Sequence, residues 1–497
     1  MLRRPRSAPG ERQASPLTAC FVVLVLLATS AQSFSREPTG KFLIASDLHF
    51  NPFADPTLVA DLAAANPRQW EAILSQSKLT AYSQYGKDTN WWLLQSSLDA
   101  MRTTLPHPAL VMVTGDLLAH GFPQAYKNAT HDSDGKYYRA FVLKTVEFLG
   151  EELRKRFNRS QILITPGNND DECGDYDIQA DGPFLSDTAD LARNLVRAGD
   201  PFTANWKALG SYTVQPRAIR GIRIISLNTV FFSNKYHAAS FANGCSQVDS
   251  TAASRTFTWL ESNLALARQA HEKVWLMLHI PPGIDGYATM MQYRQMSQGA
   301  APSEELCSKA IVPMWNPVWT SRFDGIMQDF QSTITASFAG HNHTDDFRVI
   351  HAGATGGEFV LIDPPISPIY GQNPAFRVVT FGADGGLADQ STYYLTNLKM
   401  AGSETPGKWM REYNFAAEWQ SRQLDASSLG KIYERIKNDP QARAQWLRLL
   451  NVSSSDDQVP STAVGTLDCA IAALDPAAYQ QCYCSTTEAP GSSSPVP

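Results

Sequence analysis

The chain has no excess of basic residues. Its 497 residues include 42 lysines and arginines against 48 aspartates and glutamates, which gives a net charge of −6. A protein that binds duplex DNA or RNA uses a basic face to neutralise phosphates. We therefore expect no duplex nucleic acid among its partners. The composition, 43% hydrophobic and 18% charged, is that of a globular protein long enough for one large catalytic domain with an appendage.

Long apolar runs are scarce as well. The clearest is at 19–28, after a start that contains four arginines, and it is too short for a membrane span. A basic start, a short apolar run and small residues at Ala31 and Ser33 predict a cleaved signal peptide over 1–33. The alternative is an uncleaved anchor. We expect a protein without a stable transmembrane anchor that is secreted, or that resides in a periplasm or a lysosome-like lumen.

Cysteine is the third scarce residue, with seven in the chain, of which Cys20 falls in the predicted signal. Six remain, and an even number in an exported chain favours disulfides. Cys469 paired with Cys482 or Cys484 would close a short loop. A metal clip at Cys482-Tyr-Cys484 is the rival interpretation, but two cysteines do not complete a zinc site.

What the sequence does contain is a series of short apolar runs that end in polar residues. Runs at 41–46, 110–114 and 162–165 predict buried strands. The next runs, at 222–227, 274–278 and 333–339, predict three more. The helices expected between these strands cover 89–104, 134–157, 250–270 and 322–329. Polar residues that could bind a metal follow five of the strands: Asp47, His49, Asp116, Asn168, His279, His341 and His343.

These seven residues are about what two divalent cations need when water fills the remaining positions. One carboxylate can bind two cations, which makes Asp116 the natural shared ligand. A neutral amide from Asn168 suits the site because Asp47 and Asp116 already supply negative charge. Each piece alone has a simpler explanation: a lone D-x-H arises by chance, and a single histidine such as His279 at a strand end is more often structural.

Two stretches near these residues have open interpretations. The acidic loop at 170–177 is predicted to be solvated, apart from Asp170, which we expect to support the ligands. Residues 284–320, rich in methionine, aromatic residues and proline, predict an irregular insertion near the active face. It would either shape a substrate cleft or cover an edge of the structure.

The rest of the chain predicts more strands and then helices. Strands are expected at 347–350, 359–362, 376–381 and 392–395, completing a second sheet. Helices are expected at 416–437, 440–450 and 467–474. The expected organisation is a signal peptide at 1–33, a catalytic domain at 34–404, a helical C-terminal region at 405–484 and a disordered tail at 485–497.

In this order, the motifs D-x-H, GD, GN-x-D, H and GHxH resemble the calcineurin-like metallophosphoesterase superfamily over about residues 41–380. GDLLAH at 115–120 and HIPPG at 279–283 resemble the acid sphingomyelinase and sphingomyelinase-like phosphodiesterase branch. The resemblance implies an α/β fold, a two-sheet β sandwich flanked by helices. It also implies two divalent ions, with zinc as the metal. One is held by Asp47, His49, Asp116 and His343, and the other by Asp116, Asn168, His279 and His341.

The chain departs from the family pattern in two places. Asn169 stands where many members have a histidine, and an amide cannot donate a proton near neutral pH. His120 is therefore our candidate for the catalytic acid, beside Asp116, with a structural or substrate-contacting role as the alternative. Acid sphingomyelinase also has a saposin domain before its catalytic domain, whereas only residues 34–40 separate the predicted signal from the first strand here. That spacing favours the saposin-free members, which are associated with nucleotide and related phosphodiesters.

The expected function is that of a secreted phosphodiesterase with two metal ions. A metal-bridging hydroxide would attack a small-molecule phosphodiester, either nucleotide-like or a phospholipid headgroup. The alternatives are a phosphomonoesterase or nucleotidase on the same scaffold, and a binding protein that has lost catalysis. Loss of a metal ligand would mark the last of these, and all seven candidates are present.

Overall fold

The computed structural model describes residues 38–130, 132, 136–236, 249–298, 303–353, 356–455 and 461–485. All of them belong to one compact unit, Ser35–Pro497. The predicted signal peptide, Cys245 and residues 486–497 of the predicted tail lie outside the described residues. No helix among the described residues is long and apolar enough to cross a bilayer.

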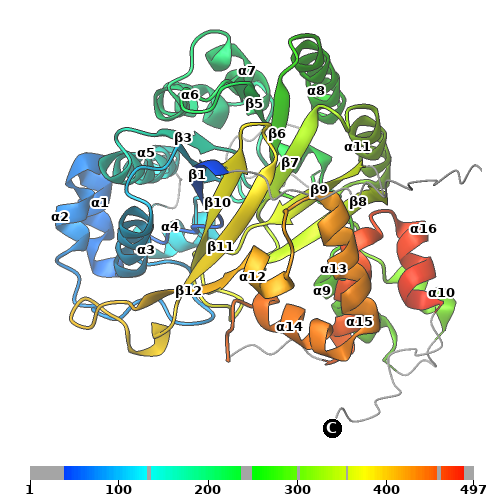
Figure 1. Cartoon of the computed structure of the whole chain (residues 1–497). Helices are drawn as coiled ribbons and strands as arrows, with labels where there is room; N and C mark the ends of the chain where they lie inside the picture. The colour runs from blue at the N-terminus through cyan, green and yellow to red at the C-terminus, as the bar shows by residue number, and fades with distance from the viewer. Residues whose placement is uncertain are drawn as a thin grey trace, which may run out of the picture. The chain divides into compact units, whose positions relative to one another are not determined.

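Two six-stranded sheets occupy the centre of this unit (Figure 1). The first sheet has the order β12-β11-β10-β1-β2-β3, with β1, β2 and β3 parallel. Its strands are β1 (Pro38–Ala45), β2 (Leu110–Val113), β3 (Gln161–Ile164), β10 (Ala375–Gly382), β11 (Leu387–Leu395) and β12 (Trp409–Asn414).

The second sheet has the order β4-β5-β6-β7-β9-β8, with β5, β6, β7 and β9 parallel. Its strands are β4 (Tyr212–Val214), β5 (Ile222–Ser226), β6 (Lys273–Met277), β7 (Ile334–Ala339), β8 (Asp346–Gly353) and β9 (Gly356–Ile362). The predicted α/β fold with two sheets is confirmed.

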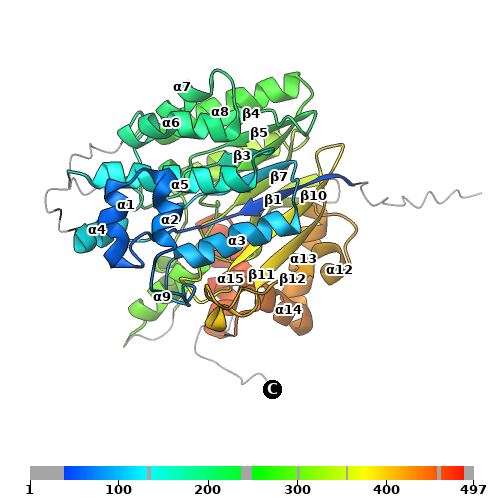
Figure 2. The ribbon, with the colours of Figure 1, turned by 90° about the vertical axis from the view of Figure 1, so that its left-hand side faces the viewer.

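Helices flank both sheets. Figure 2 shows α1 to α5 along one side of the first sheet, while α13 and α15 pack on β8 of the second. The first eight are α1 (Val59–Ala64), α2 (Trp70–Leu74), α3 (Trp91–Thr104), α4 (Phe122–Thr130), α5 (Tyr138–Arg156), α6 (Pro183–Val196), α7 (Phe202–Leu209) and α8 (Ala252–Gln269). The others are α9 (Gly286–Met296), α10 (Glu304–Lys309), α11 (Pro317–Asp329), α12 (Phe415–Trp419), α13 (Ala426–Asn438), α14 (Pro440–Leu450), α15 (Ser461–Ala472) and α16 (Pro476–Tyr479).

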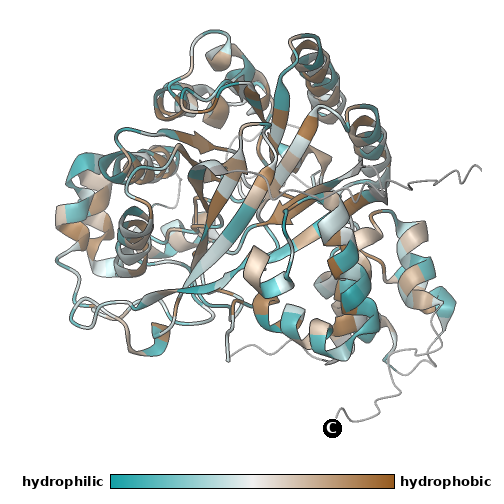
Figure 3. Cartoon of the chain, in the orientation of Figure 1, coloured by the Kyte–Doolittle hydropathy of each residue, from teal (hydrophilic) through white to brown (hydrophobic). Residues whose placement is uncertain are grey.

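Aromatic side chains join the two sheets. Phe42 of β1 stacks on Trp275 of β6 with ring centroids 5.0 Å apart, and it meets Phe338 of β7 edge-on at 5.6 Å. Every residue of β2 and β3 is buried, which explains why these strands are continuous apolar runs in the sequence. Figure 3 shows hydrophobic segments on the central strands and a mixture of hydrophobic and hydrophilic segments on the flanking helices.

Three expectations about the later part of the chain were wrong. The four strands predicted after residue 346 do not complete one sheet, because β8 and β9 join the second sheet while β10 and β11 join the first. The helix predicted over 416–437 is two helices, because Gln420 takes a left-handed φ of 54° at the end of α12 and Asp425 caps α13. Residues 284–320 are not irregular throughout, since they contain α9, α10 and the start of α11.

The domain boundary between residues 404 and 405 stays a prediction. Beyond it, β12 pairs with β11 and so extends the first sheet before the C-terminal helices begin.

The disulfides tie the C-terminal helices to the rest of the fold. Cys469 pairs with Cys482, which confirms one of the two predicted partners, and Cys307 of α10 pairs with Cys484. Cys173 is also disulfide-bonded. Disulfides of this number are typical of proteins in an oxidising compartment.

Candidate metal centre

The seven residues predicted as metal ligands meet at the carboxyl ends of five strands. Asp47 and His49 follow β1, Asp116 follows β2 and Asn168 follows β3. From the second sheet, His279 follows β6, while His341 and His343 follow β7. Parallel strands within a sheet end at a common edge, which is why residues far apart in the sequence come together here.

Backbone hydrogen bonds hold the strand-end loops against one another. The Asp47 N–H donates to the Gly115 carbonyl at 3.1 Å, and the Gly340 N–H donates to the His279 carbonyl at 2.9 Å. The loops of neighbouring strands are thus fixed by their main chains, independently of the side chains that they carry.

One group of ligand atoms surrounds a point between the loops after β1 and β7. His49 Nε2 lies 3.1 Å from His343 Nε2, and His343 Nε2 lies 3.4 Å from Asp47 Oδ1. Asp47 and His49 are fully buried, and His343 is 4% exposed. These side chains turn their ligating atoms toward each other rather than toward water.

A second group lies beside the first. His279 Nε2 is 3.0 Å from Asn168 Oδ1 and 3.3 Å from Asp116 Oδ2. His341 completes it, since its ring nitrogen lies within 4.8 Å of the ligating atoms of Asp116 and His279. The Asn168 side chain is oriented by its own amide N–H, which donates to Asp175 Oδ1 at 2.6 Å and leaves the carbonyl oxygen facing His279.

Asp116 stands between the two groups. Its Oδ2 is 3.3 Å from His49 Nε2 on one side and 3.3 Å from His279 Nε2 on the other. Asn169 holds this carboxylate from behind, with its backbone N–H on Oδ1 and its side-chain amide on Oδ2, both at 2.9 Å. Asn169 therefore positions Asp116, a role that sequence reasoning missed because it considered the residue only as a lost acid.

Two backbone carbonyls select the tautomers of the central histidines. His49 Nδ1 lies 2.9 Å from the Leu118 carbonyl, and His279 Nδ1 lies 2.7 Å from the Thr114 carbonyl. A carbonyl can only accept, so each Nδ1 carries the proton and each Nε2 offers its lone pair to the centre. This is how proteins prepare histidines for metal binding. The donor set, lone pairs of nitrogen and oxygen facing one another across about 3 Å, fits a pair of cations.

The electrostatics of the centre also favour bound cations. Burial lowers the pKa of His49 to about 4 and holds the pKa of His343 well below its usual range, so both rings are neutral, the form that binds metal. For His279, burial acts in the same direction but the nearby Asp116 carboxylate outweighs it, raising the pKa to about 9. Without an ion, a proton therefore takes the lone pair that a metal would take.

The backbone at the centre is strained in a consistent way. Asp47, His49, Asp116, His341 and His343 all have φ between 39° and 71°, a region that side-chain-bearing residues rarely adopt. Such conformations persist where the surrounding structure enforces them. They allow a strand end to reverse sharply and aim its side chain inward.

Gly340 makes one of these reversals feasible. A Cβ at this position would overlap the Ser46 hydroxyl and come within 2.8 Å of Asp47 Oδ2. The loop after β7 can therefore approach the loop after β1 only because residue 340 has no side chain. The close approach of these two loops thus explains the glycine of the GHxH motif.

His120, the predicted catalytic acid, lies beside the first group, with a ring nitrogen within 4.8 Å of the ligating atoms of His49 and His343. Its ring stacks on that of His49 with centroids 4.0 Å apart. Asp88 binds it twice, at Nδ1 with 3.0 Å and at the backbone N–H with 2.9 Å. Burial lowers the pKa of His120, but the Asp88 carboxylate outweighs it and the net shift is upward. Its Nε2 lies 3.3 Å from the hydroxyl of Tyr370, a residue that is 58% exposed.

Asp170 confirms its predicted supporting role. Its carboxylate accepts from the N–H groups of Leu117 at 2.7 Å, Leu118 at 3.1 Å and Gly167 at 2.8 Å, so it links the loops after β2 and β3. The prediction that the rest of this acidic loop is solvated was wrong for Asp171, which is 3% exposed.

The opposite edge carries residues that sequence reasoning did not find. The Tyr176 hydroxyl lies 3.3 Å from His341 Nε2, and Lys235 Nζ donates to the same hydroxyl at 3.3 Å. Neither residue belongs to a motif, and neither do Asp88 and Tyr370. Only the tertiary structure brings them to the site, so no sequence pattern could have identified them.

With the geometry in place, comparison with known proteins decides the family. The family model for Calcineurin-like phosphoesterase matches residues 40–345. The chain belongs to the calcineurin-like phosphoesterase family. It is an enzyme that hydrolyses phosphoric esters, and the predicted resemblance is confirmed. The family fold implies divalent metal ions, and the clustered side chains described above form its candidate metal-binding site.

Relatives in sequence place the chain beside the acid sphingomyelinase-like enzymes. It is 27% identical to Sphingomyelinase phosphodiesterase D of Dictyostelium discoideum, over 68% of this chain and 67% of that one. It is 24% identical to human Acid sphingomyelinase-like phosphodiesterase 3b, over 91% and 92% of the two chains. It is 23% identical to mouse Cyclic GMP-AMP phosphodiesterase SMPDL3A, over 89% and 91%. Among solved structures, a dimetal phosphatase from Danio rerio covers 76% of this chain and 99% of its own, at 11% identity and a TM-score of 0.40.

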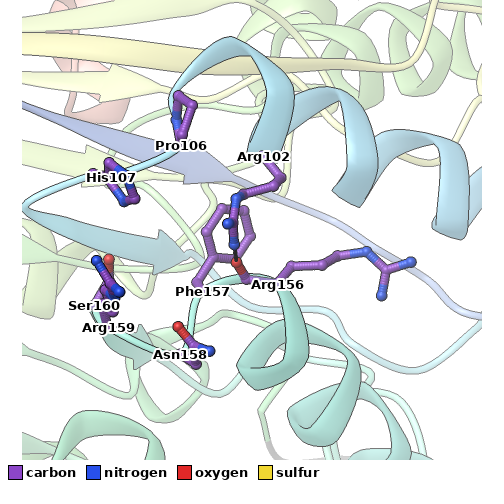
Figure 4. Close-up of a pocket in the computed structure, with 8 residues that line it drawn as sticks. All are labelled: Arg102, Pro106, His107, Arg156, Phe157, Asn158, Arg159 and Ser160. Carbon is purple, nitrogen blue, oxygen red and sulfur yellow. Dashed lines mark hydrogen bonds between the residues drawn. The ribbon is translucent and has the colours of Figure 1, made fainter.

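A cavity of about 330 Å³ lies at the other end of the first sheet, before β2 and β3 (Figure 4). Two of its basic residues are engaged with neighbouring groups. Arg156 pairs with Asp99 and Glu152, and Arg102 donates to the Arg156 carbonyl. The cavity is thus a feature of the structural framework, remote from the strand ends that carry the family's chemistry.

Proposed function

We propose that this enzyme is a secreted phosphodiesterase that uses two divalent metal ions. The observation that supports it most is the position of Asp116, whose Oδ2 lies 3.3 Å from a histidine of each ligand group. One ion would be held by Asp47, His49, Asp116 and His343, and the other by Asp116, Asn168, His279 and His341. Four imidazoles among seven ligands suit zinc better than magnesium or calcium, which prefer oxygen.

When bound, such a pair of ions supplies Lewis acidity, which lowers the pKa of water and neutralises charge on phosphate. The protein's own residues supply the geometry. Asn169 fixes the plane of the Asp116 carboxylate, and the Leu118 and Thr114 carbonyls fix the rings of His49 and His279. This preorganisation lets charge develop on the phosphoryl group without rearrangement of the site.

His120 would protonate the leaving oxygen. Asp88 occupies its Nδ1, so the proton available for transfer is on Nε2. That nitrogen now contacts the Tyr370 hydroxyl, and the leaving oxygen of a bound ester would take the place of this hydroxyl. The dyad of Asp88 and His120 thus compensates for Asn169, which cannot donate a proton near neutral pH.

The names of the relatives favour diesters over monoesters, since each of the three described above is called a phosphodiesterase. The test is turnover by the purified chain on a diester and its matching monoester, with and without a chelator. Chelator-sensitive cleavage of the diester, with little cleavage of the monoester, is the expected result. A preference for the monoester would make the enzyme a phosphatase instead. Diester cleavage that survives metal depletion would contradict the metal mechanism.

The acid role of His120 has its own test. His120→Ala should lower turnover of an alkyl diester by about 100-fold or more, because a general acid contributes about that much. The loss on a p-nitrophenyl diester should be far smaller, because that leaving group needs no proton. Asp88→Asn should give the same pattern with a smaller loss. Equal losses on both substrates would remove His120 from the acid role.

Export is supported by the disulfides, because such bonds persist in oxidising compartments. N-terminal sequencing of the protein released by its own host should begin just after Ala31 or Ser33. Retention of residues 1–33 on a membrane fraction would instead identify this segment as an anchor.

A further inference from the structure

Lys235 is an exposed cation at the edge of the candidate metal centre. Its ammonium group donates to the Tyr176 hydroxyl at 3.3 Å and lies 5.0 Å from the centre of that ring. The same hydroxyl lies 3.3 Å from Nε2 of His341. The positive charge therefore stands about two hydrogen-bond lengths from a proposed metal ligand, on the opposite edge from His120.

The charge of Lys235 is not neutralised by an ion pair with any residue that the structure describes. Two carboxylates are near enough to feel it, since Lys235 acts to lower the pKa of Asp175 and of Asp285, although burial raises both overall. Both are engaged elsewhere: Asp175 Oδ1 accepts from the Asn168 amide, and Asp285 Oδ1 caps α9 at the Ala288 N–H. Within the described part of the chain, the ammonium donates its hydrogen bond to a neutral hydroxyl, so it keeps its capacity to bind an anion.

The anchor of this lysine is rigid. Tyr176 is 7% exposed, its backbone N–H donates to the Asn168 carbonyl at 2.8 Å, and its φ is 64°. The backbone N–H of Lys235 donates to the Ser233 hydroxyl at 3.1 Å. Tyr176 thus holds a flexible lysine side chain at a defined place beside His341, which reduces the entropy lost when an anion binds.

We infer that Lys235, positioned by Tyr176, binds a second anionic group on the substrate, next to the phosphodiester that the metal centre cleaves. The inference rests on the proposed phosphodiesterase function and narrows it to diesters that carry a further phosphate or carboxylate. A substrate with a cationic headgroup would place its positive charge against Lys235 and is disfavoured.

The experiment uses two diesters that differ by one anionic group: p-nitrophenyl thymidine 5′-phosphate, and the same compound with a 3′-phosphate. The measured quantity is the ratio of their kcat/KM values. In Lys235→Met, the advantage of the diester with the 3′-phosphate should fall about tenfold, the typical contribution of a charge-assisted hydrogen bond. Lys235→Arg should retain most of it. Lys207→Met, which changes an exposed lysine on α7, should retain the wild-type ratio.

Equilibrium binding gives a readout that does not depend on turnover. Calorimetry should show that the wild-type protein binds thymidine 3′,5′-bisphosphate more tightly than thymidine 5′-phosphate, and that Lys235→Met loses about tenfold of this difference. The difference should also shrink as salt is raised, because exposed charges are screened.

Three outcomes would overturn the inference. The wild type could treat the two diesters alike. Lys235→Met could lower both kcat/KM values equally, which would mean that the lysine only supports Tyr176. Or p-nitrophenyl phosphorylcholine could be the better substrate, with Lys235→Met improving it further. If the wild type cleaves none of these diesters, the proposed function fails instead, and the binding measurement still decides the role of Lys235.

Discussion

At the scale of single residues, the centre depends on one carboxylate and on the amide behind it. Asp116 faces a histidine from each sheet, and Asn169 holds both of its oxygens. Asn169 cannot donate a proton near neutral pH, but it orients the carboxylate that the two proposed ions would share. In the proposed mechanism, His120 and Asp88 carry the proton instead.

Asp116→Asn tests this arrangement. The amide has the size of the carboxylate but no negative charge to share between two cations, so we expect loss of bound metal. Turnover should fall by more than about 100-fold, since even indirect partners of metal ligands contribute that much. Elemental analysis and diester turnover measure the two effects, with Asp61→Asn, an exposed change on α1, as the control. A variant that keeps both metal and turnover would rule out the bridging assignment.

At the scale of elements, the site is a set of strand ends brought close together. The loop after β7 lies so near the loop after β1 that any side chain at Gly340 would overlap Ser46. The position of the site is therefore a property of how the two sheets pack, and a single methyl group can disturb it.

Gly340→Ala should lower metal content and turnover, and destabilise the fold by about 1–3 kcal/mol, the usual cost of overpacking. Thermal unfolding measures the change in stability, and elemental analysis measures the metal content. Gly325→Ala is the matched control, because nothing lies within 4 Å of a Cβ at that position in α11. That change should be neutral or slightly stabilising, since alanine favours a helix. If both variants kept wild-type stability and metal content, the close approach of the loops after β1 and β7 would be contradicted.

The same scale shows what the sequence could and could not predict. Strand ends that carry Asp47, Asp116 and His279 follow short apolar runs, so both the strands and the clustering of these candidate ligands were predictable. The sheet to which β10 and β11 belong was not predictable, because the sequence of a strand does not indicate which other strand it pairs with. Residues such as Lys235 and Asp88 reach the site only through tertiary packing.

Two of the disulfides allow a comparison of loop lengths. Cys307–Cys484 closes a loop with a sequence separation of 177, and Cys469–Cys482 one of 13. The chain-entropy argument gives about 5 kcal/mol for the long loop and about 3 kcal/mol for the short one. Paired serine substitutions should therefore lower the denaturation midpoint more for the Cys307 pair. The reverse order would show that local strain or packing outweighs loop entropy.

At the scale of the whole molecule, buried acids make stability depend on pH. Burial raises the pKa of Glu412 to about 8, and those of Glu358 and Asp363 to about 7. Each of these carboxyls has one oxygen without a hydrogen-bond partner among the described residues. The folded state therefore binds protons more tightly than the unfolded state, in which such groups titrate near their ordinary values.

These acids therefore make stability fall as the pH rises. Their contribution to the free energy of unfolding is fully present below about pH 4 and is lost as pH rises toward 8. The metal-free protein should thus melt at a higher temperature at pH 5.5 than at pH 8. Glu412→Gln should reduce that difference by roughly 2 °C. Glu404→Gln, an exposed change, should not affect it. A melting temperature that rises between pH 5.5 and pH 8 in all variants would contradict the expectation.

The bond between Cys307 and Cys484 also has a consequence for biogenesis. It cannot form until synthesis has passed Cys484, 177 residues after the cysteine near α10. At about 5–20 residues per second, that interval lasts roughly 10–35 s. During it, the Cys307 thiol is open to oxidants and to other thiols in the compartment. The disulfide therefore cross-links the stretch between α9 and α11 only after the rest of the fold has been synthesised. Production of the folded enzyme then depends on the host's machinery for disulfide formation.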